Sequence, residues 1–246
     1  MTFYAHSLPG QLESKWEQLF TGTGEGHLEK VAELAATFSS EMFLPGSSES
    51  KAAQTWGSLS GLWHDLGKFS IEFQKRLGGD PTRVDHSTAG AKLAAQSSPY
   101  GPLLSYIIAG HHSGLPDGSG LFHERFKKIL PEWEANAHQF LSLANHPFPA
   151  PPVGRQMEIT DLSFTVRMLF SCLVDADFLA TEAFMQPEES ARRPKWPTDI
   201  FVRMEKVLDE HYSSHFQTST NEVESARADV RSACHGKASL PPCDRP

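Results

Sequence analysis

Apolar residues recur along this chain at intervals of three and four positions, the spacing that places them on one face of an α-helix. The segment from His27 to Met42 shows this pattern, with apolar residues at positions 28, 31, 34, 35, 38 and 42. The same spacing predicts further helices over residues 54–66, 70–77, 87–97, 102–110, 121–145, 160–184, 198–214 and 220–234. Runs that alternate apolar and polar residues, as strands do, are nearly absent. The pattern therefore predicts an all-α fold.

Two segments interrupt the helical pattern. Residues 45–50, PGSSES, read as a loop, and residues 147–154, PFPAPPVG, read as a proline-rich connection. The helix expected over 160–184 is strongly apolar and needs the first half of the chain to bury it. We therefore expect the connection to join two parts of one bundle. We place a single helical domain at residues 1–225 and a linker or tail at residues 226–246.

Composition excludes several classes of protein. The 246 residues, 39% of them hydrophobic, suffice for a core, and the formal charge of −8 argues against a wholly cationic nucleic-acid-binding surface, though not against a local basic groove. Three cysteines at wide spacing form no disulfide framework, which indicates a reducing cytoplasm. We expect neither secretion nor membrane insertion, because the sequence shows no signal peptide and no apolar run of about 18 residues. It also carries no Walker-type ATP-binding motif.

The sequence contains 12 histidines, and histidine is the commonest metal ligand. Five short stretches place histidine or aspartate at expected helix ends or on apolar helix faces. They are GEGHLEKVAEL with His27, GLWHDLGK with His64, Asp65 and Lys68, VDHSTAGAKLA with His86, IIAGHHSGLPD with His111 and His112, and LVDADFLAT with Asp175 and Asp177. Apart from Lys68, these residues are of types that bind divalent metals, and their number fits two ions better than one.

The doublet His64-Asp65 lies at the apolar end of an expected helix. Its two side chains would leave that helix about 100° apart, so one ion could use both only if the helix end came close to it. One carboxylate can, however, bridge two ions. We expect Gly67 to end the helix and Lys68 to lie at the mouth of the site, where it could meet a phosphate oxygen. The alternative for Lys68 is a solvated cation at the helix end.

Asp177 follows apolar residues one, two and three turns back on its predicted helix. A carboxylate at the end of such a stripe is costly without a cation or a firm hydrogen bond. Because Asp175 points roughly the opposite way, we favour Asp177 as the metal ligand. His27 continues an apolar stripe, so its ring should point inward. Taken by itself, this orientation fits a core histidine as well as a metal ligand. The doublet His111-His112, flanked by glycines, likewise allows a metal-free interpretation on its own.

Together these motifs resemble the HD superfamily of metal-dependent phosphohydrolases, which is named for a doublet such as His64-Asp65. The closer resemblance is to the HD nuclease domain of the type I CRISPR-associated helicase-nuclease, and it covers nearly all of residues 1–182. The segments that carry it are YAHS at 4–7, the His27 stretch, LWHDLGKFS with FQ at 73–74, DHSTAGA at 85–91, AGHHSGLPD at 109–117 and LVDADFLATE at 174–182.

The resemblance implies a single HD-type helical bundle with a two-metal site at its centre. It implies that one ion is held by His27, His64, Asp65 and Asp177, and the second by His86, His111 and His112 with Asp65 shared. Lys68 matches the lysine that closes the family's doublet motif. The implied partners are single-stranded DNA, a CRISPR RNA-guided surveillance complex, and a helicase in cis or in trans. The tail favours a chain that continues into a helicase over a separate nuclease subunit.

Two divalent ions can clamp a phosphodiester, lower the pKa of a water and stabilise the leaving oxygen, which is the chemistry that these ligands suit. Ligands rich in histidine favour Mn, Fe, Co or Ni over Mg. We therefore expect a metal-dependent nuclease that cuts single-stranded DNA, with Asp65 and Lys68 in catalytic roles. The alternatives are an HD-family phosphohydrolase of nucleotides or cyclic nucleotides, and a catalytically idle HD interaction module, whose mark would be lost ligands.

Overall fold

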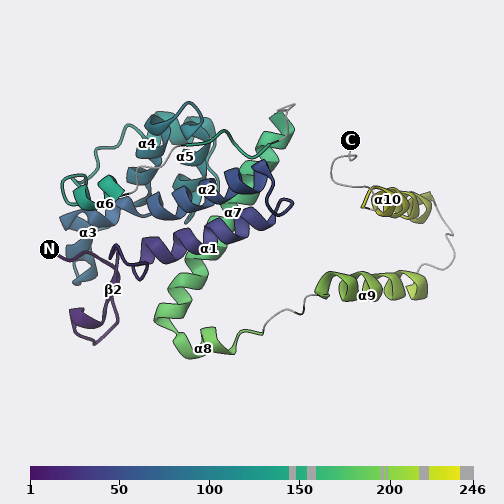
Figure 1. The fold of residues 1–246 in the computed structure, drawn as a ribbon, viewed down its shortest axis with the longest axis horizontal. Helices are drawn as coiled ribbons and strands as arrows, with labels where there is room; N and C mark the ends of the chain where they lie inside the picture. Colours follow the sequence, from purple (N-terminus) through teal and green to yellow (C-terminus); the bar gives the residue numbers. More distant parts are fainter. Residues whose placement is uncertain (144–147, 154–158, 195–196, 198, 216–221, 239–246) are drawn as a thin grey trace. The chain divides into compact units, whose positions relative to one another are not determined.

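The computed structural model describes residues 1–143, 148–153, 159–194, 197, 199–215 and 222–238 of the chain. Contacts between residues divide the chain into two units, Met1–Arg192 and Arg193–Pro246, which we describe separately. Figure 1 shows the helices and strands of both units along the sequence. Within the described ranges, no helix has the length and apolar character that crossing a membrane would require.

The first unit begins with an antiparallel ribbon of two short strands, β1 (Tyr4–His6) and β2 (Glu17–Gln18), joined through the 3-10 turn η1 (Glu13–Lys15). Helices form the rest of the described structure in this unit. They are α1 (His27–Glu41), α2 (Ser48–Trp63), the 3-10 turn η2 (Leu66–Phe69), α3 (Ile71–Leu77), α4 (Ser87–Ser97), α5 (Gly101–Gly110), the π-helical turn η3 (Ser119–Arg125), α6 (His138–Leu143), α7 (Ile159–Met185) and α8 (Pro187–Arg192).

Helices α1 and α2 lie side by side with their backbones in close contact (Figure 1). A Cβ atom on Gly61 would lie 2.5 Å from Cα of Ala32, and one on Gly57 would lie 2.6 Å from Oγ of Ser39. Gly61 thus faces the beginning of α1 and Gly57 faces its later part, so the two helices are antiparallel. As a result, the first residue of α1 and the last turn of α2 lie at the same end of the pair.

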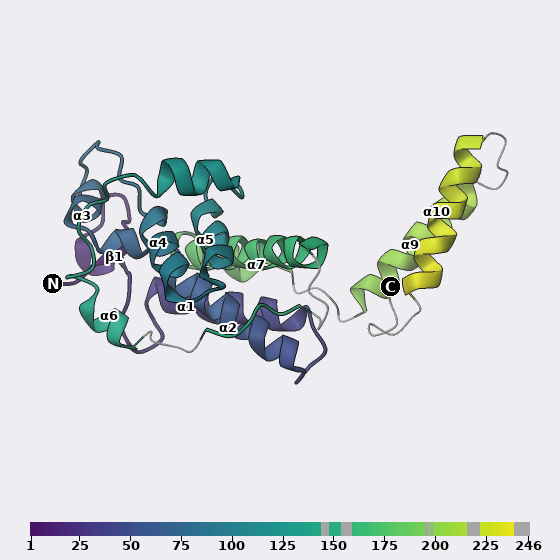
Figure 2. The ribbon, with the colours of Figure 1, turned by 90° about the horizontal axis from the view of Figure 1, so that it is seen from above.

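Helix α7 packs against α1, α2 and α5, and α4 packs against α5 (Figures 1 and 2). The hydrophobic core lies between these helices. Its largest fully buried side chains include Trp56, Leu59, Leu104, Ile107, Ile108, Leu169 and Leu173. The proline-rich segment also packs on this core, because Nε1 of Trp56 donates to the carbonyl of Pro149 at 3.2 Å. Residues on both sides of that segment belong to the first unit.

The all-α prediction is confirmed, since the described β structure is limited to the small ribbon. Helix α4 has the predicted bounds, α3 and α5 differ from theirs by one residue at one end, and α7 is one residue longer at each end. Helix α2 begins six residues and ends three residues before the helix predicted over 54–66, so part of the predicted loop 45–50 is helical. The single helix predicted over 121–145 is wrong within the described residues, which form η3 and α6 with irregular chain between them. Pro131 lies in that irregular part and lacks the N–H that a continuous helix needs.

The second unit contains α9 (Ile200–His215) and α10 (Glu222–Ala238). Helix α10 confirms the helix predicted over residues 220–234 and extends it to Ala238, and the Pro-rich end of the tail, residues 239–246, lies outside the described residues. The sequence of α10 is rich in alanine and charged residues, which favour helix. Along the sequence, the first unit ends at Arg192 and the second begins at Arg193. We predicted the nuclease domain to reach residue 225, and that domain boundary stays a prediction.

Candidate metal centre

The antiparallel α1–α2 pair brings two histidines together at one end. His27 is the first residue of α1, His64 is the residue that caps the C-terminus of α2, and their ring centroids are 5.3 Å apart. Both rings are fully buried. The inward orientation predicted for His27 is therefore confirmed, although its neighbours are polar groups of the centre as well as apolar side chains.

The end of α2 explains how His64 and Asp65 face the same point. Helix α2 ends at Trp63, and Asp65 has φ −117° and ψ 26°, outside the helical region. Nε2 of His64 consequently lies 3.2 Å from Oδ2 of Asp65. The angle of about 100° expected for a continuing helix does not apply here, because α2 ends before the doublet.

Gly67 has a different role from the predicted one. It does not end a helix but lies inside η2, where its N–H donates to the carbonyl of His86 at 3.0 Å. A Cβ atom at this position would lie 2.5 Å from Cα of His86. The absence of a side chain therefore lets the turn that carries Asp65 rest directly on the backbone of His86.

Asp65 is the central residue of the site and is 1% exposed. Its Oδ2 lies 3.2 Å from His64 and 3.7 Å from His27, while its Oδ1 lies 3.4 Å from Nε2 of both His86 and His111. Burial would raise the pKa of this carboxyl, but the positive charges of His64, Lys68 and His86 outweigh it and hold the pKa well below its usual value. An ionised carboxylate with one oxygen towards each group of histidines is suited to bridging two ions.

Lys68 does not lie at the mouth of the site. It is 4% exposed, and its Nζ lies 2.7 Å from Oδ2 of Asp65 and donates to the carbonyl of Ala5 at 3.2 Å. Both the predicted mouth position and the alternative of a solvated cation are therefore wrong. The side chain holds a buried charge against the central carboxylate.

Asp177 reaches the same centre from α7, as its apolar stripe predicts. Its Oδ1 lies 3.3 Å from Nε2 of His27 and 3.7 Å from Nε2 of His64. Burial would raise its pKa, but the contacts with these two histidines lower it far below the usual value. Asp175 is exposed and belongs to none of the metal-ligating groups found among the described residues.

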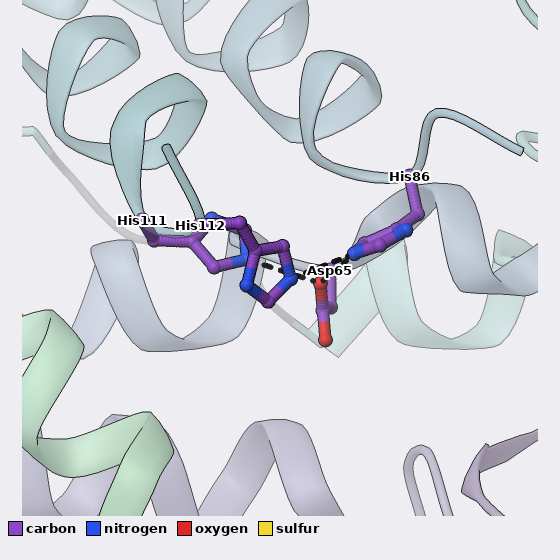
Figure 3. A group of neighbouring side chains, drawn as sticks. All are labelled: Asp65, His86, His111 and His112. Atoms are coloured by element: carbon purple, nitrogen blue, oxygen red, sulfur yellow. Dashed lines mark hydrogen bonds and ion pairs between the residues drawn. The ribbon is translucent and has the colours of Figure 1, made fainter. Parts of the chain in front are cut away.

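The remaining three histidines gather around Asp65, which lies between His86 and the pair His111 and His112 (Figure 3). His86 precedes α4 without capping it through its side chain, and His111 and His112 follow the end of α5. Nε2 of His86 lies 2.9 Å from Nε2 of His112. Burial and the charge of His111 lower the pKa of His112 to about 4, so this ring is neutral at pH 7.

Two buried rings are fixed by helix ends. Nδ1 of His64 donates to the carbonyl of Gly61 and Nδ1 of His111 donates to that of Ile108, both at 2.7 Å. Each acceptor lies three residues earlier, in the last turn of a helix, where carbonyls lack a partner within the helix. These bonds leave Nε2 of each ring free to face Asp65.

The donor set fits divalent metal. Nε2 of His27, His64 and His111 and Oδ1 of Asp65 are buried and have no hydrogen-bond partner among the described residues, although such groups are normally satisfied, and Oδ2 of Asp65 is paired with the Lys68 ammonium. Three groups of residues each have ligand atoms within 4.8 Å of one another. The first is His27, His64 and Asp65, and the second is His64, His111 and Asp177. The third is Asp65 with the three histidines of Figure 3. Imidazole nitrogen and carboxylate oxygen are ligands of borderline transition metals.

Without metal, His27 and His64 carry protons that such an ion would displace. Burial would lower the pKa of His27, but its contacts with Asp177, Asp65 and Glu17 raise it to about 9. Burial has the same effect on His64, where the charge of Asp65 and the contact with Asp177 raise the pKa to about 10. Ion binding at these residues therefore competes with protons.

Sequence reasoning missed two residues beside the centre, His6 and Glu17. Oε2 of Glu17 lies 2.7 Å from Nδ1 of His6 and 3.4 Å from Nδ1 of His27. Glu17 is 4% exposed. Its sequence, KWEQLF, gives no periodic signal that would distinguish a buried glutamate from an exposed one. His6 lay in the segment YAHS that carried part of the resemblance.

A helical bundle with buried imidazoles and carboxylates converging on a His-Asp doublet is the architecture of an HD-type metal-dependent hydrolase. The family model described as "Cas3, HD domain" matches residues 26–183, more than half of the chain. The chain belongs to this family, and the predicted resemblance is confirmed: it is an HD-type, CRISPR-associated nuclease domain. No curated protein matches the chain.

Proposed function

We propose that this domain hydrolyses phosphodiester bonds of single-stranded DNA during CRISPR interference, using two divalent transition-metal ions. Membership of the Cas3 HD family supports the reaction class. The observation that carries the proposal is the division of the ligands around Asp65. In the proposed site, one ion is held by His27, His64, Asp65 and Asp177, and the other by Asp65, His86, His111 and His112.

Two bound ions would clamp the scissile phosphate, lower the pKa of a water and stabilise the leaving oxygen. The residues of the chain hold this arrangement in place. Asp65 faces both groups of ligands, and Lys68, at 2.7 Å, fixes its carboxylate and balances its charge. We assign Lys68 to this electrostatic role instead of direct contact with phosphate, because its ammonium group is buried.

The choice of metal follows from the ligands. Five of the seven proposed ligands are histidines, which favours Mn, Fe, Co or Ni over the oxygen-seeking Mg. Access supports a single strand as substrate. The ligands His27, His64 and Asp65 are fully buried, whereas His112 is exposed. A flexible single strand can bring its phosphate to such a recessed site more easily than a rigid duplex can.

The family also supports the proposed partners, which are a helicase in cis or in trans and an RNA-guided surveillance complex, with the cytoplasm as the place of action. An HD-family nucleotide phosphohydrolase and an idle HD module are outcomes of the test below. The second is disfavoured because the chain carries every proposed ligand.

A cleavage assay tests the proposal. The purified domain should degrade labelled single-stranded DNA without ATP, leave blunt duplex DNA largely intact, and lose activity in EDTA. Mn, Co or Ni should restore activity better than Mg, and Ca should not restore it. Equal rates on single and double strands would contradict the substrate assignment. Turnover of nucleotides alone would favour the phosphohydrolase, and activity restored by Mg alone would contradict the ligand assignment.

Three aspartate variants sharpen this test. Asp65→Ala should abolish cleavage and remove most bound metal, because it removes charge from both sites. Asp177→Ala should weaken one ion and leave the other. Asp175→Ala is the matched control, since Asp175 is exposed on the same helix. Metal content is measured by elemental analysis. If Asp65→Ala retained two ions and normal cleavage, the metal assignment would be refuted.

A further inference from the structure

His27 differs from the other two fully buried ring ligands in what its Nδ1 contacts. His64 and His111 follow helix C-termini and donate to backbone carbonyls of the last helical turn there. His27 stands at a helix N-terminus, where the free backbone groups are N–H donors and cannot accept from a ring nitrogen. Its Nδ1 is buried and makes no hydrogen bond within the described part of the chain, and the group that faces it, at 3.4 Å, is the Oε2 atom of Glu17.

We infer that Glu17 is a positioning residue, whose carboxylate accepts from Nδ1–H of His27 and thereby turns Nε2 of that ring towards Asp65 and Asp177. The inference rests on the ligand set of the proposed function. Glu17 itself would contact neither metal nor DNA. Carboxylates behind metal-binding histidines fix the tautomer and the ring orientation and raise the basicity of the ligand.

The carboxylate of Glu17 is itself firmly held. Its Oε2 accepts from Nδ1 of His6 at 2.7 Å, and the ring of His6 packs edge-on against that of His27, with centroids 4.8 Å apart. Glu17 is 4% exposed, so both rings face a carboxylate that is shielded from water.

Backbone hydrogen bonds fix the position of Glu17 relative to His27. The N–H of Leu28 in α1 donates to the carbonyl of Leu19 at 3.0 Å, and the N–H of Leu19 donates to that of Phe3 at 2.8 Å. The side chain of Gln74 ties the ribbon to the turn after the doublet, because its Nε2 donates to the carbonyls of Tyr4 and Lys68. The ribbon lies before the segment matched by the family model, so the match does not cover this support.

A metal ion bound between His6, Glu17 and His27 is the alternative, because their ligand atoms lie within 4.8 Å of one another. In that case His27 would serve one ion through each ring nitrogen. A neutral imidazole has only one nitrogen free to accept, so the ring would have to lose its remaining proton. A hydrogen bond from Nδ1 to Glu17 requires no such loss, which favours the positioning role.

Metal titration of the chelator-treated protein with Co²⁺, followed by calorimetry and visible absorption, tests the inference. Glu17→Ala should weaken one of the two ions by about 10- to 100-fold and leave the other unchanged. Glu17→Gln should weaken it less, because an amide oxygen still accepts from Nδ1. Gln18→Ala is the matched control, since Gln18 is the exposed neighbour of Glu17 on β2.

The double variant Glu17→Ala/Asp177→Ala identifies which ion is affected. Its remaining ion should bind as tightly as in Asp177→Ala alone, because both changes act on the same site. Equal weakening of both ions would indicate a general structural role and overturn the inference, as would wild-type affinity in Glu17→Ala. A third ion, lost in both Glu17→Ala and His6→Ala, would establish the alternative. If the unaltered protein binds no metal, the proposed function fails as well.

Discussion

Replacing Gly67 by alanine should separate the two parts of the metal centre by a measurable amount. The new Cβ atom would lie 2.5 Å from Cα and 2.6 Å from the carbonyl oxygen of His86, whereas real Cβ atoms essentially never come closer than 3.0 Å to such atoms and normally stay beyond 3.4 Å. The neighbouring atoms are backbone and cannot rotate away. The turn and the His86 segment must therefore move apart by about 0.5 to 0.9 Å, the difference between these distances and 2.5 Å.

That displacement exceeds what metal coordination tolerates, since ligand distances in a functional site vary by only about 0.2 Å. It acts between Asp65 and His86, two proposed ligands of the second ion, whose atoms are 3.4 Å apart. We expect affinity for that ion to fall by at least about 10-fold, as for other disturbed metal supports. The free energy of unfolding should fall by about 1–3 kcal/mol, the usual cost of overpacking.

Co²⁺ titration and urea unfolding measure the two effects of Gly67→Ala. Gly236→Ala is the matched control, because Gly236 lies in a helix with no atom within 4 Å of an added Cβ, and this change should leave metal affinity unaltered. Wild-type affinity for both ions together with undiminished stability in Gly67→Ala would refute the reasoning.

Two further changes test the supports of the centre. Glu29→Ala removes an acceptor used by Thr21, Gly24 and Gly26 before α1 and should cost about 1–2 kcal/mol in urea unfolding at pH 7. Burial would raise the pKa of Glu29, but hydrogen bonds from Thr21, Gly24 and Gly26 lower it below 4.5. The contribution of Glu29 to the free energy of unfolding is therefore present above that pH and is lost as pH falls through the folded pKa. An equal cost of Glu29→Ala at pH 7 and pH 3 would contradict this. Arg125→Met removes the guanidinium hydrogen bonds to the carbonyl of Ala109 and to Oγ of Ser87. Affinity for the ion near His86 and His111 should fall by about 10-fold in Co²⁺ titration. Equal loss of affinity for both ions would contradict this role of Arg125.

The sequence was sufficient to predict most of the helices and the family, because both depend on local patterns. Helical spacing placed α4 and α7 almost to the residue, and the apolar stripe before Asp177 selected it over Asp175. The helix ends were harder to predict. Helix α2 ends at Trp63 and not near Gly67, which instead contacts the backbone of His86, nineteen positions along the chain.

Residues whose roles come from distant contacts escaped prediction for the same reason. Lys68 looked like an exposed cation at a helix end, but its side chain lies under the ribbon and bonds to Ala5, 63 positions earlier. Glu17 has no local pattern at all, and its burial follows from the docking of β2 beside α1. The hydrophobic periodicity of a helix indicates which of its faces is buried, but it does not indicate which polar groups lie against that face.

The backbone contact between α1 and α2 also identifies a place where the protein should accept a reporter group. The site lies at one end of this pair, and the connection 42–47 lies at the other, about 22 Å away along the 15 residues of α1. Leu44 in that connection is 62% exposed, whereas Gly46, with φ +80°, would be strained by any side chain and should be left unchanged. Because Gly57 and Gly61 fix the two helices through their backbones, an inserted tag or a fluorophore at Leu44 would leave His27 and His64 in register.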